Sequence, residues 1–474
     1  MIEVALTLQR WIRPALLAAA ATLCLSGCLR QTGATALEPR RPVAEGPDDS
    51  KITETDRVGG SFMLGGQPFC FLGTNNYYVS FKSKKMTDDV LESAKAMGLK
   101  VIRVWGYIDK GKADGSGSVD GTGDKEGVYF QYWDAAKNRP AYNDGPTGLE
   151  HLDYVLDKAQ KLDLKVMVVL TNNWRDFGGM DQYLTWYGLK QHHLFYSDKA
   201  VIGAFKDYAA HLVSRKNSVS GVVYRDDPTI FGWELANEPR CTSGYDFDDR
   251  SGCKIETTTA WADDMSTYIK SIDKNHLVSV GDEGFFAKGG GFGYDGVDGV
   301  DHAAFLALPH IDFGTYHLYP DGWGQGIRWG NKWIQDHIEL AQSLGKPTLL
   351  EEYGVVVHRN DAMTIIDGER RQKAYPRWHE ILLKRGGNAA LFWMLGGADD
   401  HQGKYPDFDH FTVYPGDPTA KLMTQLAAQF PSEGQACRLF RKIASDVPAS
   451  KFVTVAGPQR GHQALLPLPS RPPT

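Results

Sequence analysis

The sequence predicts a single (β/α)₈ barrel, and two observations support this prediction. Segments with β-strand character alternate with segments of helical apolar spacing eight times along the 474 residues, as expected for a parallel barrel. At least two strands also end in carboxylates, which would lie at the barrel mouth where catalytic groups gather. A doubly wound sheet would alternate too, but residues 73–78 (GTNNYY) form no Gly-rich phosphate loop after the first strand.

The strand assignments rest on short β-branched and apolar runs such as LKVMVVL at 164–170. The fourth strand is the apolar run that ends at Asn237-Glu238-Pro239, because proline cannot continue a buried ladder. The predicted strands are residues 68–75, 100–105, 164–170, 229–238, 276–282, 311–316, 347–352 and 389–394.

The helix assignments rest on helical apolar spacing and on glycines at the ends, as at Gly98. The fifth unit is the weakest, because residues 287–302 are rich in glycine. The predicted helices are residues 88–98, 148–162, 197–216, 256–273, 302–308, 329–344, 368–384 and 419–430.

The two ends of the chain differ from the barrel in composition. Residues 1–27 combine arginines, a short apolar run and small residues, which is typical of a signal peptide. Residues 28–56 are polar and predict a flexible tether, 57–430 the catalytic barrel, and 431–474 a partly disordered extension.

Leu25-Ser26-Gly27-Cys28 resembles a bacterial lipobox, in which the chain is cut before the cysteine and lipid is attached to its thiol. The alternative is an ordinary secretory signal with a chance cysteine. We therefore expect lipidation at Cys28 and an extracytoplasmic protein held to a membrane only by that anchor. Leu29, rather than an aspartate, favours the outer membrane if the host is Gram-negative.

The bulk composition is that of a soluble globular protein, with 42% hydrophobic and 23% charged residues. A net charge of −6 without a basic stripe argues against nucleic acid as a partner. We expect a monomer.

Export implies an oxidising compartment, in which disulfides form. Cys241 and Cys253 flank a polar loop directly after the fourth strand, and we expect a disulfide between them. The sequence leaves open whether Cys70 pairs with Cys437.

Two runs with the same form indicate chemistry: WELANEPRC at 233–241 and LEEYG at 350–354. Each is an apolar strand that ends in a carboxylate. An isolated glutamate is more often a structural ion-pair partner, but two carboxylates on separate strand ends are what glycoside hydrolysis requires.

With these runs, the chain resembles the endo-β-1,4-mannanase branch of glycoside hydrolase family five over residues 58–430. The other matching motifs follow successive strands: GTNNYY (73–78), VIRVWGY (101–107), LTNNWRDFGGMDQY (170–183), TYHLYP (315–320) and LFWML (391–395).

The resemblance implies that Glu238 is the general acid/base and Glu352 the nucleophile. Glu238 then needs a raised pKa, whereas Glu352 must stay ionised with support from Arg103. Glu351 is the rival nucleophile, but adjacent strand residues face opposite ways, and the family places the nucleophile directly before the aromatic. By the same alternation, Asn237 should face away from Glu238 locally, and the resemblance assigns it to the sugar 2-hydroxyl.

The resemblance also implies that His317 and Tyr319 line the catalytic subsite and that Trp393 is a platform beneath the sugar. Trp105 and Trp174 are candidates for neighbouring subsites, with ordinary packing nearly as good an explanation.

The implied activity is retaining endo-hydrolysis of β-mannan, with the carboxyl groups ~5 Å apart. This chemistry requires no cofactor and no metal, and the sequence has no HExxH, EF-hand or P-loop signature. The alternatives are another family-five β-glycanase, an exo-β-mannosidase, or a surface glycan-binding lipoprotein that has lost catalysis.

Overall fold

The computed structural model describes residues 52–53, 60–120, 127–243, 251–401 and 403–430. The predicted signal peptide, Cys28, most of the tether, Cys437 and the rest of the C-terminal extension lie outside these residues. The predicted tether ended at residue 56, whereas β1 (Ile52–Thr53) already pairs antiparallel with β2 (Met63–Leu64), which in turn pairs with β3 (Gln67–Pro68).

The predicted barrel is confirmed. Within the described residues, eight strands form one parallel sheet in the order β11-β10-β9-β5-β4-β14-β13-β12. The sheet closes between its edge strands, where the backbone N–H of Asp312 donates to the carbonyl of Val278. The strands are β4 (Phe71–Asn75), β5 (Val101–Trp105), β9 (Lys165–Val169), β10 (Ile230–Glu234), β11 (Leu277–Ser279), β12 (Gly314–Leu318), β13 (Thr348–Tyr353) and β14 (Ala389–Phe392).

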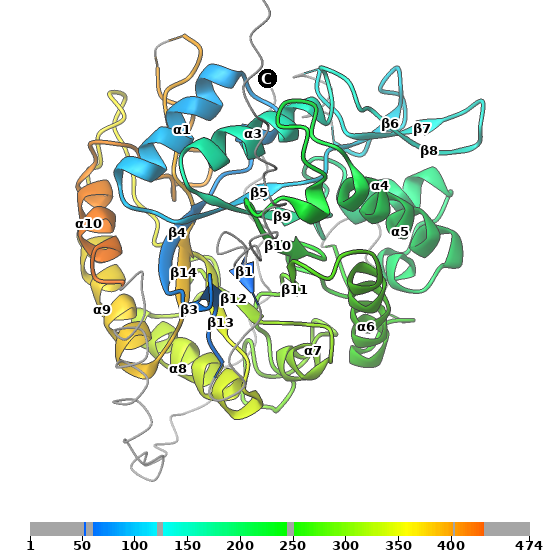
Figure 1. Cartoon of the computed structure of the whole chain (residues 1–474). Helices are drawn as coiled ribbons and strands as arrows, with labels where there is room; N and C mark the ends of the chain where they lie inside the picture. The colour runs from blue at the N-terminus through cyan, green and yellow to red at the C-terminus, as the bar shows by residue number, and fades with distance from the viewer. Residues whose placement is uncertain (1–51, 54–59, 121–126, 244–250, 402, 431–474) are drawn as a thin grey trace, which may run out of the picture. The chain divides into compact units, whose positions relative to one another are not determined.

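Helices surround this sheet, as Figure 1 shows. Their ends follow local sequence: the Ser83 hydroxyl caps α1, and Gly345 ends α8 in the left-handed region at φ 66°. The helices are α1 (Lys84–Ala96), α3 (Glu150–Lys161), α4 (Gly179–Trp186), α5 (Lys199–Ser214), α6 (Ile255–Ile272), α7 (His302–Ala307), α8 (Ile327–Leu344), α9 (Glu369–Arg385) and α10 (Pro418–Ala427).

Two apolar clusters hold the barrel together. The larger fills the space between sheet and helices. The smaller fills the barrel interior at the N-terminal ends of the strands, where Phe62 contacts Phe71, Phe231 and Phe313 with ring centroids 5.2–5.7 Å apart. The lower interior is therefore solid packing, and polar groups gather at the opposite, C-terminal ends of the strands.

The insertion after β5 forms a second small sheet of β6 (Asp109–Lys112), β7 (Gln131–Asp134) and β8 (Arg139–Tyr142). Its base is tied to α4, because Gln131 donates to Asp109 and exchanges hydrogen bonds with Tyr183. Among the described residues, no helix is both long and apolar enough to cross a membrane.

Candidate active site

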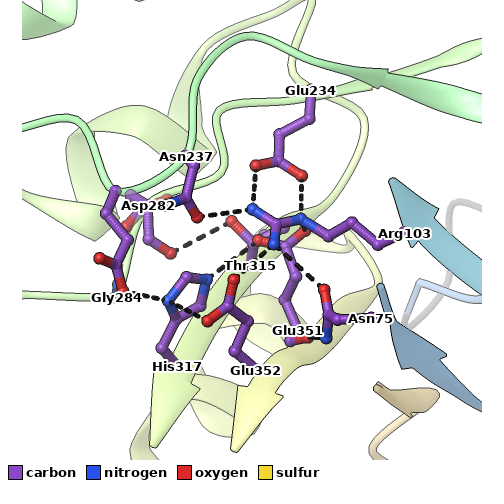
Figure 2. Close-up of polar contacts among 12 residues, drawn as sticks. Asn75, Arg103, Glu234, Asn237, Asp282, Gly284, Thr315, His317, Glu351 and Glu352 are labelled. Carbon is purple, nitrogen blue, oxygen red and sulfur yellow. Dashed lines mark hydrogen bonds and ion pairs between the residues drawn. The ribbon is translucent and has the colours of Figure 1, made fainter. Parts of the chain in front are cut away.

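Arg103 of β5 is the centre of the polar cluster at the strand ends (Figure 2). Its side chain is fully buried and donates twice to Glu234, with both distances 2.6 Å. It also donates to Asn75 at 3.1 Å, Asn237 at 2.7 Å and Glu352 at 2.5 Å. Burial opposes the charge of Arg103, but the adjacent carboxylates raise its pKa well above the usual value. Arg103 is thus a fixed cation that orients its neighbours.

His317 of β12 links the two predicted catalytic carboxyl groups. Its Nδ1 lies 2.6 Å from Oε1 of Glu238 and 3.7 Å from Oε2 of Glu352. On its other side, Nε2 lies 3.2 Å from Glu351. Tyr319, which is two residues further on, donates to Glu352 at 2.7 Å. The expectation that His317 and Tyr319 share a face of the chain is therefore confirmed.

The predicted acid and nucleophile lie close together. One oxygen of Glu238, one oxygen of Glu352 and a ring nitrogen of His317 all lie within 4.8 Å of one another. Glu352 contacts Tyr319 and retains slight exposure, whereas Glu351 is completely buried. A register shift between β12 and β13 places His317 opposite Glu352. One oxygen of each carboxyl group thus lies within 4.8 Å of the other, as expected for the ~5 Å spacing of a retaining arrangement.

The backbone around Glu238 departs from the predicted strand. Regular pairing of β10 stops at Glu234, and Glu238 adopts the left-handed conformation at φ 54°. The segment remains attached to its neighbours, because the Asn237 N–H donates to Thr171 and the Glu238 N–H to Gly281. The expected opposite facing of Asn237 and Glu238 is wrong, because strand alternation no longer holds there, and both side chains enter the cluster.

The expected rise in the pKa of Glu238 is also wrong. Burial alone would raise the pKa of Glu238, but the hydrogen bond and charge of His317, with Arg240 and Trp174, lower it to about 2. Burial raises the pKa of Glu352, although His317 and Arg103 oppose this shift. The pKa of His317 rises well above its usual value because the carboxylates outweigh its burial. In the free protein, the proton between His317 and Glu238 therefore resides on the imidazole.

The three predicted tryptophans occupy different places. Trp174 donates from Nε1 to Glu238 at 2.5 Å, so it contacts the predicted acid directly. Trp393 follows β14, stacks on Tyr77 at 6.0 Å and donates to Asp409 at 2.6 Å. Trp105 is only 5% exposed and lies 6.0 Å from Trp393 and 4.9 Å from the Arg103 guanidinium, so packing dominates its role.

Four further residues belong to this region and were not predicted as members: Asn75, Glu234, Arg240 and Glu283. Arg240 donates twice to Glu283, at 2.5 and 2.6 Å, and lies over the Trp174 ring at 5.3 Å. Burial raises the pKa of Glu283 to about 8, although Arg240 opposes the shift. A signal for Glu234 was available, since it is a carboxylate flanked by Trp233 and Leu235 in a buried strand.

The predicted disulfide between Cys241 and Cys253 is confirmed, with a Cα–Cα distance of 5.6 Å. It joins the chain just after Glu238 to the chain just before α6. The covalent link thus limits the movement of the segment next to the site.

Comparison with known proteins identifies the family. Residues 54–421 match the model for "GH family 5 beta-mannosidase-like" proteins. A probable mannan endo-1,4-beta-mannosidase C of Aspergillus terreus is 38% identical over 375 residues, covering 77% of this chain and 88% of the relative.

Two solved structures show the same fold. The endo-1,4-beta-mannanase of Rhizomucor miehei aligns with a TM-score of 0.69 and 39% identity, over 80% of this chain and 99% of that one. The endo-1,4-beta-D-mannanase of Thermotoga petrophila aligns with a TM-score of 0.66 and 39% identity, over 76% and 100%. With a match that spans most of its length, this chain belongs to the β-mannosidase-like family of glycoside hydrolase family 5.

Proposed function

We propose that the protein is a retaining endo-β-1,4-mannanase. The observation that carries the proposal is the pair Glu238 and Glu352, held within 4.8 Å and tied to Arg103, His317 and Tyr319. Relatives named as mannan endo-1,4-beta-mannosidases support mannan as the substrate and internal bonds as the point of cleavage.

In the proposed reaction, Glu352 attacks the anomeric carbon and Glu238 protonates the leaving oxygen. The proton reaches Glu238 from Nδ1 of His317 across their 2.6 Å contact. Glu238 then removes a proton from water, which releases the sugar from Glu352 with its β configuration retained. Arg103 and Tyr319 orient Glu352 and favour its ionised form during the attack.

The substrate-binding roles are proposed from position. The Asn237 amide gives one N–H to Asn172, which leaves its second N–H for the sugar 2-hydroxyl. Trp393 supplies a flat apolar face beneath the sugar at the cleavage point. Trp174, which contacts Glu238, lines a neighbouring subsite, and Trp105 supports the platform by packing against Trp393. No cofactor takes part in these steps.

The nucleophile is tested by a matched pair of variants. Glu352→Gln should lower kcat by a factor on the order of 10⁴–10⁶ with the fold intact, as for other covalent-catalysis residues. Glu351→Gln, one residue earlier, should remain measurably active because the Glu351 carboxylate is fully buried and contacts His317 and Arg103 from behind the site. If Glu351→Gln were inactive and Glu352→Gln remained active, Glu351 rather than Glu352 would be the nucleophile.

The substrate is tested by turnover on mannan, glucomannan and cellulose in parallel, with the product lengths recorded. Early release of mixed oligosaccharides from mannan is expected. Release of mannose alone would indicate an exo-β-mannosidase, preference for cellulose another β-glycanase, and no turnover a glycan-binding protein.

We also propose that the chain is exported and anchored by lipid at Cys28. The support is the sequence Leu25-Ser26-Gly27-Cys28 at the end of a short apolar run.

A further inference from the structure

We propose that Glu238, His317 and Glu352 also form a binding site for one divalent transition-metal ion of the Zn²⁺ or Co²⁺ class. Each residue offers one ligand atom, and these atoms lie within 4.8 Å of one another. Ligands of a tetrahedral ion with bonds of ~2.1 Å are roughly 3.4 Å apart, so a small movement of one carboxylate completes the site.

The orientation of His317 is that of a metal ligand. Its Nε2 donates to the buried carboxylate of Glu351, and its Nδ1 points between Glu238 and Glu352. A carboxylate on the far nitrogen commonly fixes the ring and tautomer of metal-binding histidines. On binding, the ion replaces the proton at Nδ1, which leaves to solvent.

The local charge can accommodate a further cation. Five carboxyl groups share this region with three cationic groups, and all eight are buried or nearly so. A divalent ion that displaces the Nδ1 proton of His317 adds only one net positive charge to this carboxyl-rich site. The groups are Glu234, Glu238, Glu283, Glu351 and Glu352 against Arg103, Arg240 and protonated His317.

The ligand set selects the type of ion. One imidazole nitrogen and two carboxylate oxygens suit Zn²⁺, Co²⁺ or Cu²⁺. Ca²⁺ and Mg²⁺ need six or more oxygen ligands and have little use for the nitrogen. We therefore expect discrimination against Mg²⁺ of at least about 100-fold.

The bound ion would occupy the place of the reacting sugar. It engages the proposed nucleophile and the proposed acid together, so it should inhibit hydrolysis in competition with substrate. This consequence rests on the proposed function, whereas ion binding itself does not.

The direct test uses Co²⁺ as the probe on the full chain. Visible absorption of bound Co²⁺ is titrated for the wild type and for Glu238→Gln and Glu352→Gln, each of which removes one ligand. Both variants should lower the affinity for Co²⁺ at least about tenfold. Glu351→Gln, which alters the partner of Nε2 but removes no ligand, should weaken Co²⁺ binding about 10–100-fold.

The matched control is His358→Gln. His358 and Asp367 form an exposed histidine–carboxylate pair at 2.5 Å, which is the competing place for adventitious Co²⁺. This variant should bind Co²⁺ like the wild type. Loss of Co²⁺ from His358→Gln, or unchanged binding in Glu238→Gln and Glu352→Gln, would overturn the proposal.

X-ray absorption of the Zn²⁺-loaded wild type gives a readout that does not depend on variants. One nitrogen and two protein oxygen ligands are expected, and a shell without histidine nitrogen would refute the site. A protein that binds Co²⁺ through these residues but hydrolyses no mannan would refute the proposed function alone.

Discussion

At the residue scale, the buried charges around Arg103 decide how the site is organised. A guanidinium removed from water is costly unless nearly all its N–H groups have acceptors. Glu234 provides two of these acceptors, and Asn75, Asn237 and Glu352 provide the others. Glu234 thus anchors Arg103, and Arg103 in turn positions the nucleophile.

Glu234→Gln should therefore lower the free energy of unfolding by about 3–5 kcal/mol, because it leaves a buried cation without its strongest partner. Urea denaturation measures this loss, and kcat should fall while KM changes little. Asp264→Asn is the control, since its contact with Lys206 is partly exposed and should cost less than about 1 kcal/mol. A Glu234→Gln protein as stable as this control would show that Arg103 needs no anchor.

The pair His317–Glu238 should give stability a distinct pH dependence. The pKa of Glu238 is lowered from 4.5 to about 2, so its contribution is present above about pH 4.5 and lost as pH falls towards 2. The pKa of His317 is raised well above 6.5, so its contribution is full below about pH 6.5 and lost as pH rises through the raised value.

His317→Gln should consequently destabilise the protein most between about pH 4.5 and 6.5. Urea unfolding of wild type and variant at about pH 3.5, 5.5 and 8.5 measures the difference at each pH. His211→Gln, which alters an exposed contact with Asp144, should show a small and nearly constant difference. A His317→Gln difference that is constant across this range would contradict the linkage.

At the element scale, the irregular end of β10 is what brings the acid into the site. Glu238 leaves the strand geometry. Gly281, which follows β11, lets the backbone of the Glu238 segment approach the chain after β11 closely. Gly281 has φ +86°, and a Cβ there would lie 2.0 Å from the Ala236 carbonyl oxygen and 2.3 Å from Glu234. Only glycine satisfies both the conformation and the space.

Gly281→Ala should destabilise the protein and displace the segment that carries Glu238. Gly289→Ala is the matched control, because Gly289 also has positive φ but nothing lies within 4 Å of its Cβ position. Gly289→Ala should lower the free energy of unfolding by about 1–2 kcal/mol because of backbone strain. Gly281→Ala should lower it by about 1–3 kcal/mol more because of the clash. A shift of the acid should also lower kcat by up to about 100-fold. If Gly281→Ala and Gly289→Ala changed the free energy of unfolding and kcat by the same amounts, the contact with Ala236 would be unimportant.

At the scale of the whole molecule, the residues that form the barrel and the residues expected to determine its location lie in different parts of the sequence. The barrel carries the site, whereas Cys28 lies outside the described residues. A multiply acylated cysteine holds a protein stably at a membrane, while one acyl chain gives only marginal binding.

Cys28→Ser should release active enzyme into the soluble fraction. Fractionation of cells followed by a mannan assay of pellet and supernatant measures the change. An active-site variant such as Glu352→Gln, followed by immunoblot because it is inactive, should stay with the membrane. A Cys28→Ser protein that still pellets would place the anchor elsewhere or mean that the apolar run is not cleaved.

The sequence by itself determined the eight strand–helix units, the two strand ends that carry Glu238 and Glu352, and the disulfide beside them. These features follow from short-range patterns: apolar periodicity, a proline stop and the position of cysteines around a loop. The fifth unit was assigned despite its glycines, and α7 is indeed short.

Only the tertiary structure decided which buried groups meet. Arg103 lies 131 residues from Glu234 and 249 from Glu352, and no local pattern reports such pairings. The left-handed backbone at Glu238 reversed the expected facing of Asn237, and the contact with His317 reversed the expected pKa direction of Glu238. The physical reason is that a pKa depends on the charges packed around a group, and those charges come from strands that are remote in the chain.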